Sequence, residues 1–377
     1  MKNTCRARLR RLSVSCSILT ACIVIARPTR RVYAMDVNGL QTKARQGYVA
    51  EQLELGEAYL MGKGLPKSDK DAEYWYEKAA NSGNAEAANL VGYMYQAGVG
   101  VPADPARAVR WFELSAASGC SNALINLGVM HMVGVGVPKD PTRAAEYFRR
   151  GLEHGNGTGA AYLGTMAYFG TGMKPDNNAA EGWFKAGQKL HDLIATYDLG
   201  ILYLTAPDRL NDLGKAARYL RQAADANFAP AMQSLGTLLL RHPELSRHRG
   251  ETVRRLQAAA DAGSWQASLA LGVMAHNGSG MVADDKTAYF HLRVAILQGG
   301  SAAQILANKH IPTVIQSLGD GQARAVEAKA LAWVQQRSRA PTLVQTKGQP
   351  PRFFADPAMQ GSSGVLSAAL PMEDPAS

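Results

Sequence analysis

Residues 83–119 read GNAEAANLVGYMYQAGVGVPADPARAVRWFELSAASG, and the pattern of this stretch recurs along the chain with a constant step of 36 residues. Seven glycines share one register: Gly56, Gly92, Gly128, Gly164, Gly200, Gly236 and Gly272. A second series runs through Gly47, Gly83, Gly119, Gly155, His191, Asn227, Gly263 and Gly299, and its members are expected to end helices. A fixed period between about 20 and 50 residues is typical of a solenoid of stacked repeats.

Each repeat is predicted to form two amphipathic helices. In the quoted stretch, residues of one face fall at helical spacing twice: first Ala87, Val91, Gly92 and Tyr95, and further along Ala108, Trp111, Phe112 and Ser115. A third series places an aromatic residue on the second helix, at Trp75, Trp111, Tyr147, Trp183 and Tyr219, before Arg255 and His291. We expect Trp111 and its equivalents to cover the next hairpin.

The linker between the two helices carries signals for a tight reversal. Its glycines permit the turn, Asp104 is expected to cap the second helix, and Pro105 suits the first turn of that helix. Asp140 and Asp176 repeat the cap. Gly92 lies inside the first helix, where glycine costs about 1 kcal/mol, so we expect it to allow the two helices of a hairpin to approach closely.

The repeated pattern A-x-x-x-L-G-x-x-Y-x-x-G-x-G-V-x-x-D-x-x-x-A-x-x-W-x-x-x-A-A-x-x-G resembles the Sel-one-like repeat family, relatives of tetratricopeptide repeats, over residues 47–299. The G-x-G element occurs at Gly62/Gly64, Gly98/Gly100, Gly134/Gly136, Gly170/Gly172 and Gly278/Gly280. Repeats five and six replace it, so their linkers need not share the family loop. The predicted fold is an all-α, right-handed solenoid of about seven helix-turn-helix repeats with a concave groove.

The N-terminal segment predicts export. Residues 1–31 hold eight Lys or Arg and no acidic residue around an apolar run that is shorter than the roughly 20 residues that span a bilayer. Cleavage after Ala34 would release a soluble protein, whereas Leu-Thr-Ala-Cys ending at Cys22 resembles a lipobox that would leave Cys22 acylated. Three arginines after the run oppose translocation, so an uncleaved or cytoplasmic product is a third interpretation. We expect an exported, periplasmic or envelope-associated protein, with membrane attachment through the N-terminus as an alternative.

Charge and cysteine content argue against a nucleic-acid-binding protein and against a disulfide-stabilised one. The net charge is +10, but residues 1–31 supply +8 of it, so the remainder has no large basic excess to neutralise phosphates, and no nucleic-acid partner is expected. Cys120 is the sole cysteine beyond residue 22, which leaves no disulfide framework. Cysteine-rich members of the family, linked to penicillin binding, hold each unit with a disulfide, and this chain lacks those pairs.

Four segments are predicted. Residues 1–34 form the export signal or anchor, 35–311 the solenoid, 312–340 a C-terminal capping helix, and 341–377 a disordered tail with six prolines and no apolar period. Within the second and third segments, an unpaired helix is expected to open the array just before Gly47, and a polar-faced helix carrying Trp333 is expected to close it.

No catalytic, cofactor or metal site is predicted. The G-x-G linkers lack the third glycine and the following Lys-Ser/Thr of a phosphate loop, so hairpin turns are favoured. Residues 241–249, RHPELSRHR, hold two imidazoles close to Glu244. A solvated loop is the default interpretation of this Arg/His-rich segment, with a metal site and a basic patch for an acidic partner as the alternatives.

Partner-binding residues are predicted from helix geometry. On the first helix of repeat two, Val91, Gly92 and Tyr95 are expected to point into the stack, which leaves the stripe through Tyr93 facing the groove. The predicted contact residues in successive repeats are Tyr93, Asn126, Tyr162, Asp198 and Ser234.

The resemblance implies a non-catalytic adaptor or scaffold of the bacterial cell envelope that binds a protein or peptide, with regulation of a membrane sensor or complex as a sharper form. The alternative from another class is a cell-wall-active or penicillin-binding enzyme like the cysteine-rich relatives. A passive spacer is a third hypothesis. The oligomeric state is left open.

Overall fold

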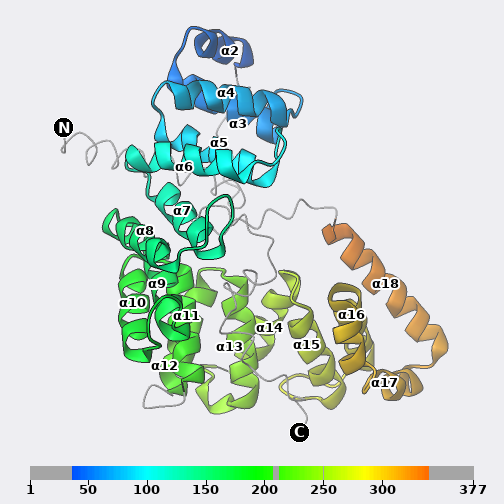
Figure 1. Cartoon of the computed structure of the whole chain (residues 1–377). Helices are drawn as coiled ribbons and strands as arrows, with labels where there is room; N and C mark the ends of the chain where they lie inside the picture. Colours follow the sequence, from blue (N-terminus) through cyan, green and yellow to red (C-terminus); the bar gives the residue numbers. More distant parts are fainter. Residues whose placement is uncertain (1–35, 207–211, 249, 339–377) are drawn as a thin grey trace. The chain divides into compact units, whose positions relative to one another are not determined.

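The computed structural model describes residues 36–206, 212–248 and 250–338, which contain seventeen α-helices, one short 3₁₀ helix and no strand (Figure 1). This confirms the predicted all-α, helix-turn-helix fold. The described residues divide into two compact units, one up to Ala195 and one from Thr196 onward. The predicted export signal and the predicted C-terminal tail lie outside the described residues.

The first unit opens with a short helix and continues as hairpins of two 13-residue helices. The opening helix α2 begins after its cap Asp36 and lies just before Gly47, as predicted. Helices α3 and α4, α5 and α6, α7 and α8, and α9 and α10 pack as hairpins, and the second helix of each of the first three packs on the first helix of the next. The bounds are α2 Val37–Arg45, α3 Val49–Met61, α4 Asp69–Asn81, α5 Ala85–Ala97, α6 Pro105–Ala117, α7 Ser121–Val133, α8 Pro141–Glu153, α9 Gly157–Phe169 and α10 Asn177–Lys189.

The second unit continues the same arrangement from within α11, with less regular linkers. Its bounds are α11 Leu193–Thr205, α12 Leu213–Asp225, α13 Ala229–Arg241, η2 Pro243–Leu245, α14 Glu251–Asp261, α15 Trp265–Asn277, α16 Asp285–Ala307, α17 Ile311–Leu318 and α18 Asp320–Ser338. The closing segment is two helices rather than the single one predicted, because Gly319 between α17 and α18 has a φ of 76° and a ψ of 151° that no α-helix accepts.

Helix ends follow the sequence signals. Asp104, Asp140 and Asp176 each cap a second helix by accepting a hydrogen bond from a backbone N–H in its first turn. His191 and Asn227, the two departures from the second glycine series, have left-handed φ values of 59° and 62°. That series fails only at its last member: α16 runs through Gly299, where Trp265 packs, and the left-handed residue is Gly300.

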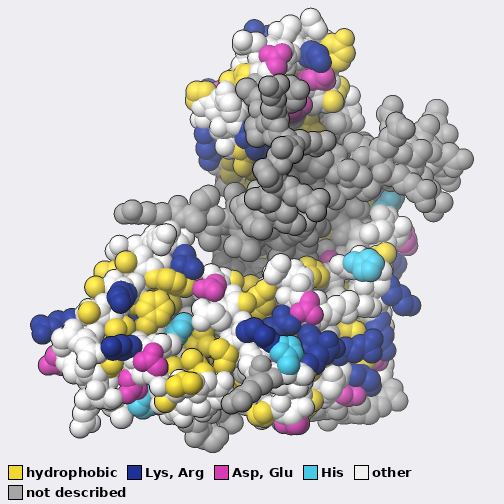
Figure 2. Space-filling view, turned by 180° about the vertical axis from the view of Figure 1, so that it is seen from behind, with side chains coloured by type: hydrophobic (Ala, Val, Ile, Leu, Met, Phe, Trp, Pro, Cys, Tyr) yellow, Lys and Arg dark blue, Asp and Glu magenta, His cyan; other side chains and the backbone are white. Residues whose placement is uncertain are grey.

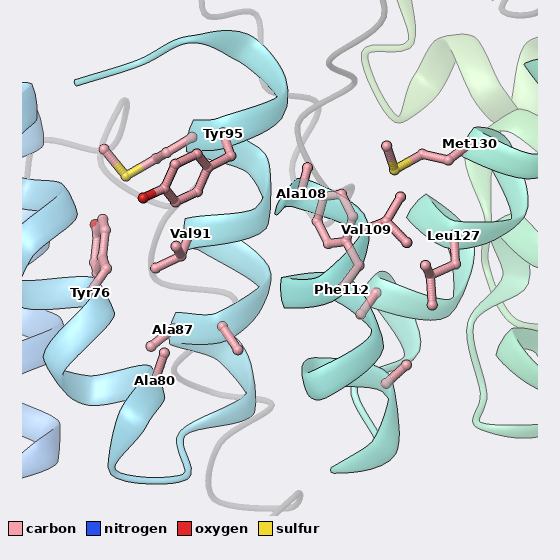
Figure 3. Packing of buried hydrophobic residues seen from close by; sticks show 14 of the residues in the cluster. Tyr76, Ala80, Ala87, Val91, Tyr95, Ala108, Val109, Phe112, Leu127 and Met130 are labelled. Atoms are coloured by element: carbon pink, nitrogen blue, oxygen red, sulfur yellow. The ribbon is translucent and has the colours of Figure 1, made fainter. Parts of the chain in front are cut away.

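The core of each hairpin is a glycine facing a large side chain twenty residues later. Phe112 is fully buried within the packed cluster of the first unit (Figure 3). A Cβ added to Gly92 would lie 2.7 Å from the Phe112 ring, so a side chain at residue 92 has no room unless the helices or the ring move. The same pairs recur along both units: Gly56–Tyr76, Gly128–Phe148, Gly164–Phe184, Gly200–Leu220, Gly236–Leu256 and Gly272–Leu292. The predicted role of Gly92 is confirmed.

The ring that faces Gly92 is Phe112, the neighbour of Trp111 on the apolar face of the second helix. Trp111 is only half-buried at the edge of the cluster, and Phe112 is the ring with no exposed surface. Neighbouring helical positions differ by 100°, so of two consecutive aromatics only one can face Gly92, and the other points toward the margin.

The second glycine of the G-x-G linker connects neighbouring repeats in the first unit. A Cβ at Gly100 would collide with the backbone carbonyl of Asp69, at the start of the preceding second helix α4. Gly136 meets Pro105 in the same way one repeat later. Each linker therefore rests on the first turn of the second helix before it.

Replacing Phe112 by Ala should lower the free energy of unfolding by about 3–5 kcal/mol, since it leaves a cavity against Gly92. Replacing Trp111 by Ala should cost less, because that side chain is only half-buried. Urea unfolding followed by circular dichroism measures both. Equal losses in the two variants would contradict the assignment of Phe112 as the core ring.

Gly92→Ala should destabilise the protein by about 1–3 kcal/mol, because the methyl group has no room beside Phe112. Gly182 offers a matched control: it lies inside α10, is exposed, and has nothing within 4 Å of its added Cβ. Gly182→Ala should stabilise by roughly 0.5–1 kcal/mol through helix propensity alone. A stabilising Gly92→Ala substitution in thermal unfolding would refute the close approach.

Candidate functional site

The five predicted contact residues divide between the units and differ in exposure. In the first unit, Tyr93 on α5, Asn126 on α7 and Tyr162 on α9 are half-buried, so each presents part of its side chain to solvent. In the second unit, Asp198 on α11 and Ser234 on α13 are buried, with 3% and 2% of their surface exposed. The role of all five in partner binding stays a prediction.

The two half-buried tyrosines, Tyr93 and Tyr162, are held in place or kept neutral by their surroundings. The ring of Tyr162 stacks on Phe148 with 4.5 Å between centroids and 9° between planes, which fixes its orientation. Partial burial raises the pKa of the Tyr93 hydroxyl above its usual value, so the group is a neutral phenol throughout the physiological range. Both side chains therefore present fixed, uncharged aromatic surface.

Hydrogen bonds join successive first helices of the first unit along a seam that the sequence analysis missed. The Asn126 amide donates to the Asn89 side-chain oxygen over 3.0 Å, linking α7 to α5. Asn156, the cap of α9, donates to Asn122 on α7 over 2.9 Å. Thr158 on α9 donates to the Asp192 carboxylate over 2.8 Å.

The second unit shows contacts of the same type. The hydroxyls of Tyr197 and Ser234 lie 3.3 Å apart between α11 and α13, and Ser264, the cap of α15, donates to Gln233 over 2.7 Å. Asn89–Asn126 and Tyr197–Ser234 are both 37 residues apart and occupy the same positions of their repeats. The sequence signal for these contacts was therefore a pair of polar residues separated by 37 residues, one more than the 36-residue repeat.

Stacked rings and cations recur at the linker end of the hairpins. His131 on α7 is buried and stacks on Tyr147 at 5.4 Å, and Arg150 lies 5.7 Å from the centroid of the same Tyr147 ring. Burial, followed by the nearby charge of Arg143, lowers the pKa of His131 despite the opposing effect of Asp140. Equivalent stacks occur elsewhere, with Arg107 over Tyr95 and with Lys215 over Tyr203, which stacks on Tyr219.

The Arg/His-rich segment of repeat six is a structured linker. Arg221 on α12 binds Glu251 at the start of α14 through two hydrogen bonds, of 2.7 and 3.2 Å, and donates a third to the backbone oxygen of Leu245 over 3.1 Å. Both side chains are buried. The hydrogen bond from Arg221 and that from the Arg247 amide outweigh the cost of burial and lower the pKa of Glu251.

The described residues contain no group of three or more His, Cys, Asp or Glu side chains that could hold a metal ion. In the Arg/His-rich segment, His242 instead pairs with Glu244 over 3.1 Å. Cys120 is half-buried at the cap position of α7, between two packed helices. None of the helices in the described ranges combines the length and the hydrophobicity of a bilayer-spanning segment.

The model of the Sel1 repeat, that is, the Sel-one-like repeat, matches more than half of the chain: residues 52–84, 85–120, 121–156, 158–187, 193–228 and 265–300. The chain belongs to the Sel1 repeat family. The gap between 228 and 265 falls on repeat six, whose linker departs from the family loop. Sel1 repeat proteins generally mediate protein–protein interactions and generally act as scaffolds without catalysis.

Two solved structures similar to this Sel1 protein carry the same repeat. A Sel1 repeat protein from Oxalobacter formigenes is 27% identical, with a TM-score of 0.53, over 60% of this chain and 91% of that one. A protective antigen of uropathogenic Escherichia coli that displays an SLR fold is 24% identical, with a TM-score of 0.47, over 81% of this chain and 74% of that one. No curated protein gives a significant match.

The stability of the protein should fall as the pH drops below about 6.5, in part through His131. A histidine whose pKa is lowered on folding binds its proton more readily in the unfolded chain, so its neutral form stabilises the fold above 6.5 and that contribution is lost at lower pH. Tyr95 occupies the same position as His131 one repeat earlier, so His131→Tyr introduces a residue type that this position accepts. The variant should flatten the pH dependence of the melting temperature between pH 7 and pH 5. A His→Tyr change at the exposed His154 serves as the control for the substitution itself, and a flattening as large as that of His131→Tyr would contradict the assignment.

Proposed function

We propose that this Sel1 protein is a non-catalytic adaptor of the bacterial cell envelope that binds a protein or peptide on the first-helix surface of its first unit. This first-helix surface is the part of α5, α7 and α9 around Tyr93, Asn126 and Tyr162. The observation that carries the proposal is that these half-exposed side chains stand on successive first helices joined by side-chain hydrogen bonds. Such a platform loses little conformational entropy when a partner binds.

The chemistry of the surface favours a polypeptide partner. Tyrosines offer a large apolar area with a polar end and little rotamer entropy to lose, which is why they are enriched at protein interfaces. The seam supplies amide groups suited to a peptide backbone. Family membership supports the same class of partner.

The envelope assignment rests on the sequence of residues 1–34, with its cluster of basic residues and short apolar run. A protein placed there could regulate a membrane sensor or complex, which is the finer form of the proposal. Cell fractionation followed by mass measurement of the mature N-terminus separates cleavage after Ala34, acylation at Cys22 and retention. A cytoplasmic protein with an intact N-terminus would refute the envelope assignment.

Photo-crosslinking tests the first-helix surface. A benzophenone amino acid replacing Tyr93 or Tyr162 should give the same crosslinked partner in living cells, since both positions belong to one surface. The matched control is Leu114, which lies on the second helix α6 with 47% of its surface exposed. It should give no such adduct, and mass spectrometry identifies the partner.

An identical adduct from Leu114, or different adducts from Tyr93 and Tyr162, would argue against a single binding surface. Absence of any adduct in folded, expressed protein would favour the passive-spacer hypothesis.

A further inference from the structure

The linker of repeat six is surrounded by more cations than its carboxylates can neutralise. Glu251 is bound by Arg221, Asp225 lies 2.5 Å from Arg255, and Glu244 pairs with His242. Glu251 and Asp225 are therefore engaged in ion pairs, and Glu244 in a hydrogen bond.

The remaining cations point outward around this buried pair. Arg218, Arg247, His248 and Arg254 are all exposed. Arg218 precedes Arg221 by three residues on α12, and Arg254 follows Glu251 by three residues on α14, so each lies one helical turn from a member of the pair. Arg221 and Glu251 lie 2.7 Å apart, so the two exposed arginines flank a contact that joins α12 to α14.

The arrangement is rigid as well as charged. Arg221 holds the linker through Leu245, and the backbone N–H of Arg247 donates to Glu251 over 2.8 Å. In the space-filling view, Lys and Arg side chains gather around a histidine over the second unit (Figure 2). Because the linker backbone is held in place, binding an anion requires ordering only the cationic side chains and not the linker itself.

We propose that this basic patch, defined as Arg218, Arg247, His248 and Arg254, docks an acidic stretch of a partner protein. Guanidinium groups pair with carboxylates through two parallel hydrogen bonds, and three arginines on two helices and a linker match a short run of Asp or Glu. Nucleic acid fits less well, because a patch of three arginines and one histidine is too small to neutralise a long phosphate backbone. This site is independent of the first-helix surface and does not rest on its function.

Binding of a fluorescein-labelled peptide of ten glutamates to the full-length protein tests the proposal by fluorescence anisotropy. The protein should bind the peptide at low salt and release it as salt rises. Charge reversal in Arg254→Glu should weaken binding roughly tenfold, and adding Arg218→Glu should weaken it further.

The matched control is Arg110→Glu. Arg110 is exposed on α6 at the position equivalent to Arg218 and Arg254, so this variant changes the net charge equally in the first unit. It should bind the peptide as the parent does, and it corrects for non-specific attraction by the eight basic residues at the N-terminus. Equal weakening by Arg110→Glu and Arg254→Glu would overturn the proposal.

Two further outcomes would also overturn it: failure of the parent protein to bind the glutamate peptide, and equal or tighter binding of a ten-residue oligothymidine, which would point to a nucleic-acid site. Thermal unfolding checks that the variants fold. If Arg254→Glu is destabilised, the double variant Arg247→Gln and Arg254→Gln replaces it, with the same loss of binding expected. The crosslinks at Tyr93 should be unaffected by any of these changes, which separates this test from that of the first-helix surface.

Discussion

The contact between a helical glycine and a buried side chain twenty residues later is the constraint on which every hairpin depends. A glycine inside a helix costs about 1 kcal/mol relative to alanine, and burying a phenylalanine ring contributes about 1.5–3 kcal/mol, so the exchange favours the close hairpin. The glycine is kept in both units, whereas the facing residue changes from Tyr or Phe in the first to Leu in the second. The separation of the two helices in a hairpin is therefore set by the side chain that the glycine lacks.

The sequence predicted the helix ends and the close approach at Gly92, and left open the rotation of each helix about its axis and the register of one repeat on the next. Caps such as Asp104 and the left-handed ends at His191 and Asn227 need only local backbone geometry, and all were correctly placed. The choice between Trp111 and Phe112 required the rotation of one helix about its axis, which differs little between two adjacent apolar positions. The Asn89–Asn126 seam required the register of one repeat on the next. The break at Gly319 was hidden because glycine is tolerated within many helices.

The two kinds of linker show two solutions to one packing requirement. In the first unit, Gly100 lets its linker rest directly on the backbone of the preceding second helix. Repeat six has no such glycine, and its linker is held by the buried Arg221–Glu251 pair instead. A buried pair recovers its desolvation cost only when its hydrogen bonds are satisfied, and here Leu245 and Arg247 provide the additional partners. The departure from the family pattern is therefore compensated.

That compensation has a consequence for charge. Net charge beyond residue 31 is nearly zero, which from the sequence alone argues against a polyanion partner. The balance conceals a local separation, because Glu251 is turned inward to hold Arg221 while Arg247 and Arg254 stay at the surface. Carboxylates used for structure do not screen cations that face solvent, since a buried charge already paired presents little field outside. A chain that is neutral in composition can therefore carry a cationic surface wherever a repeat replaces glycine with an ion pair.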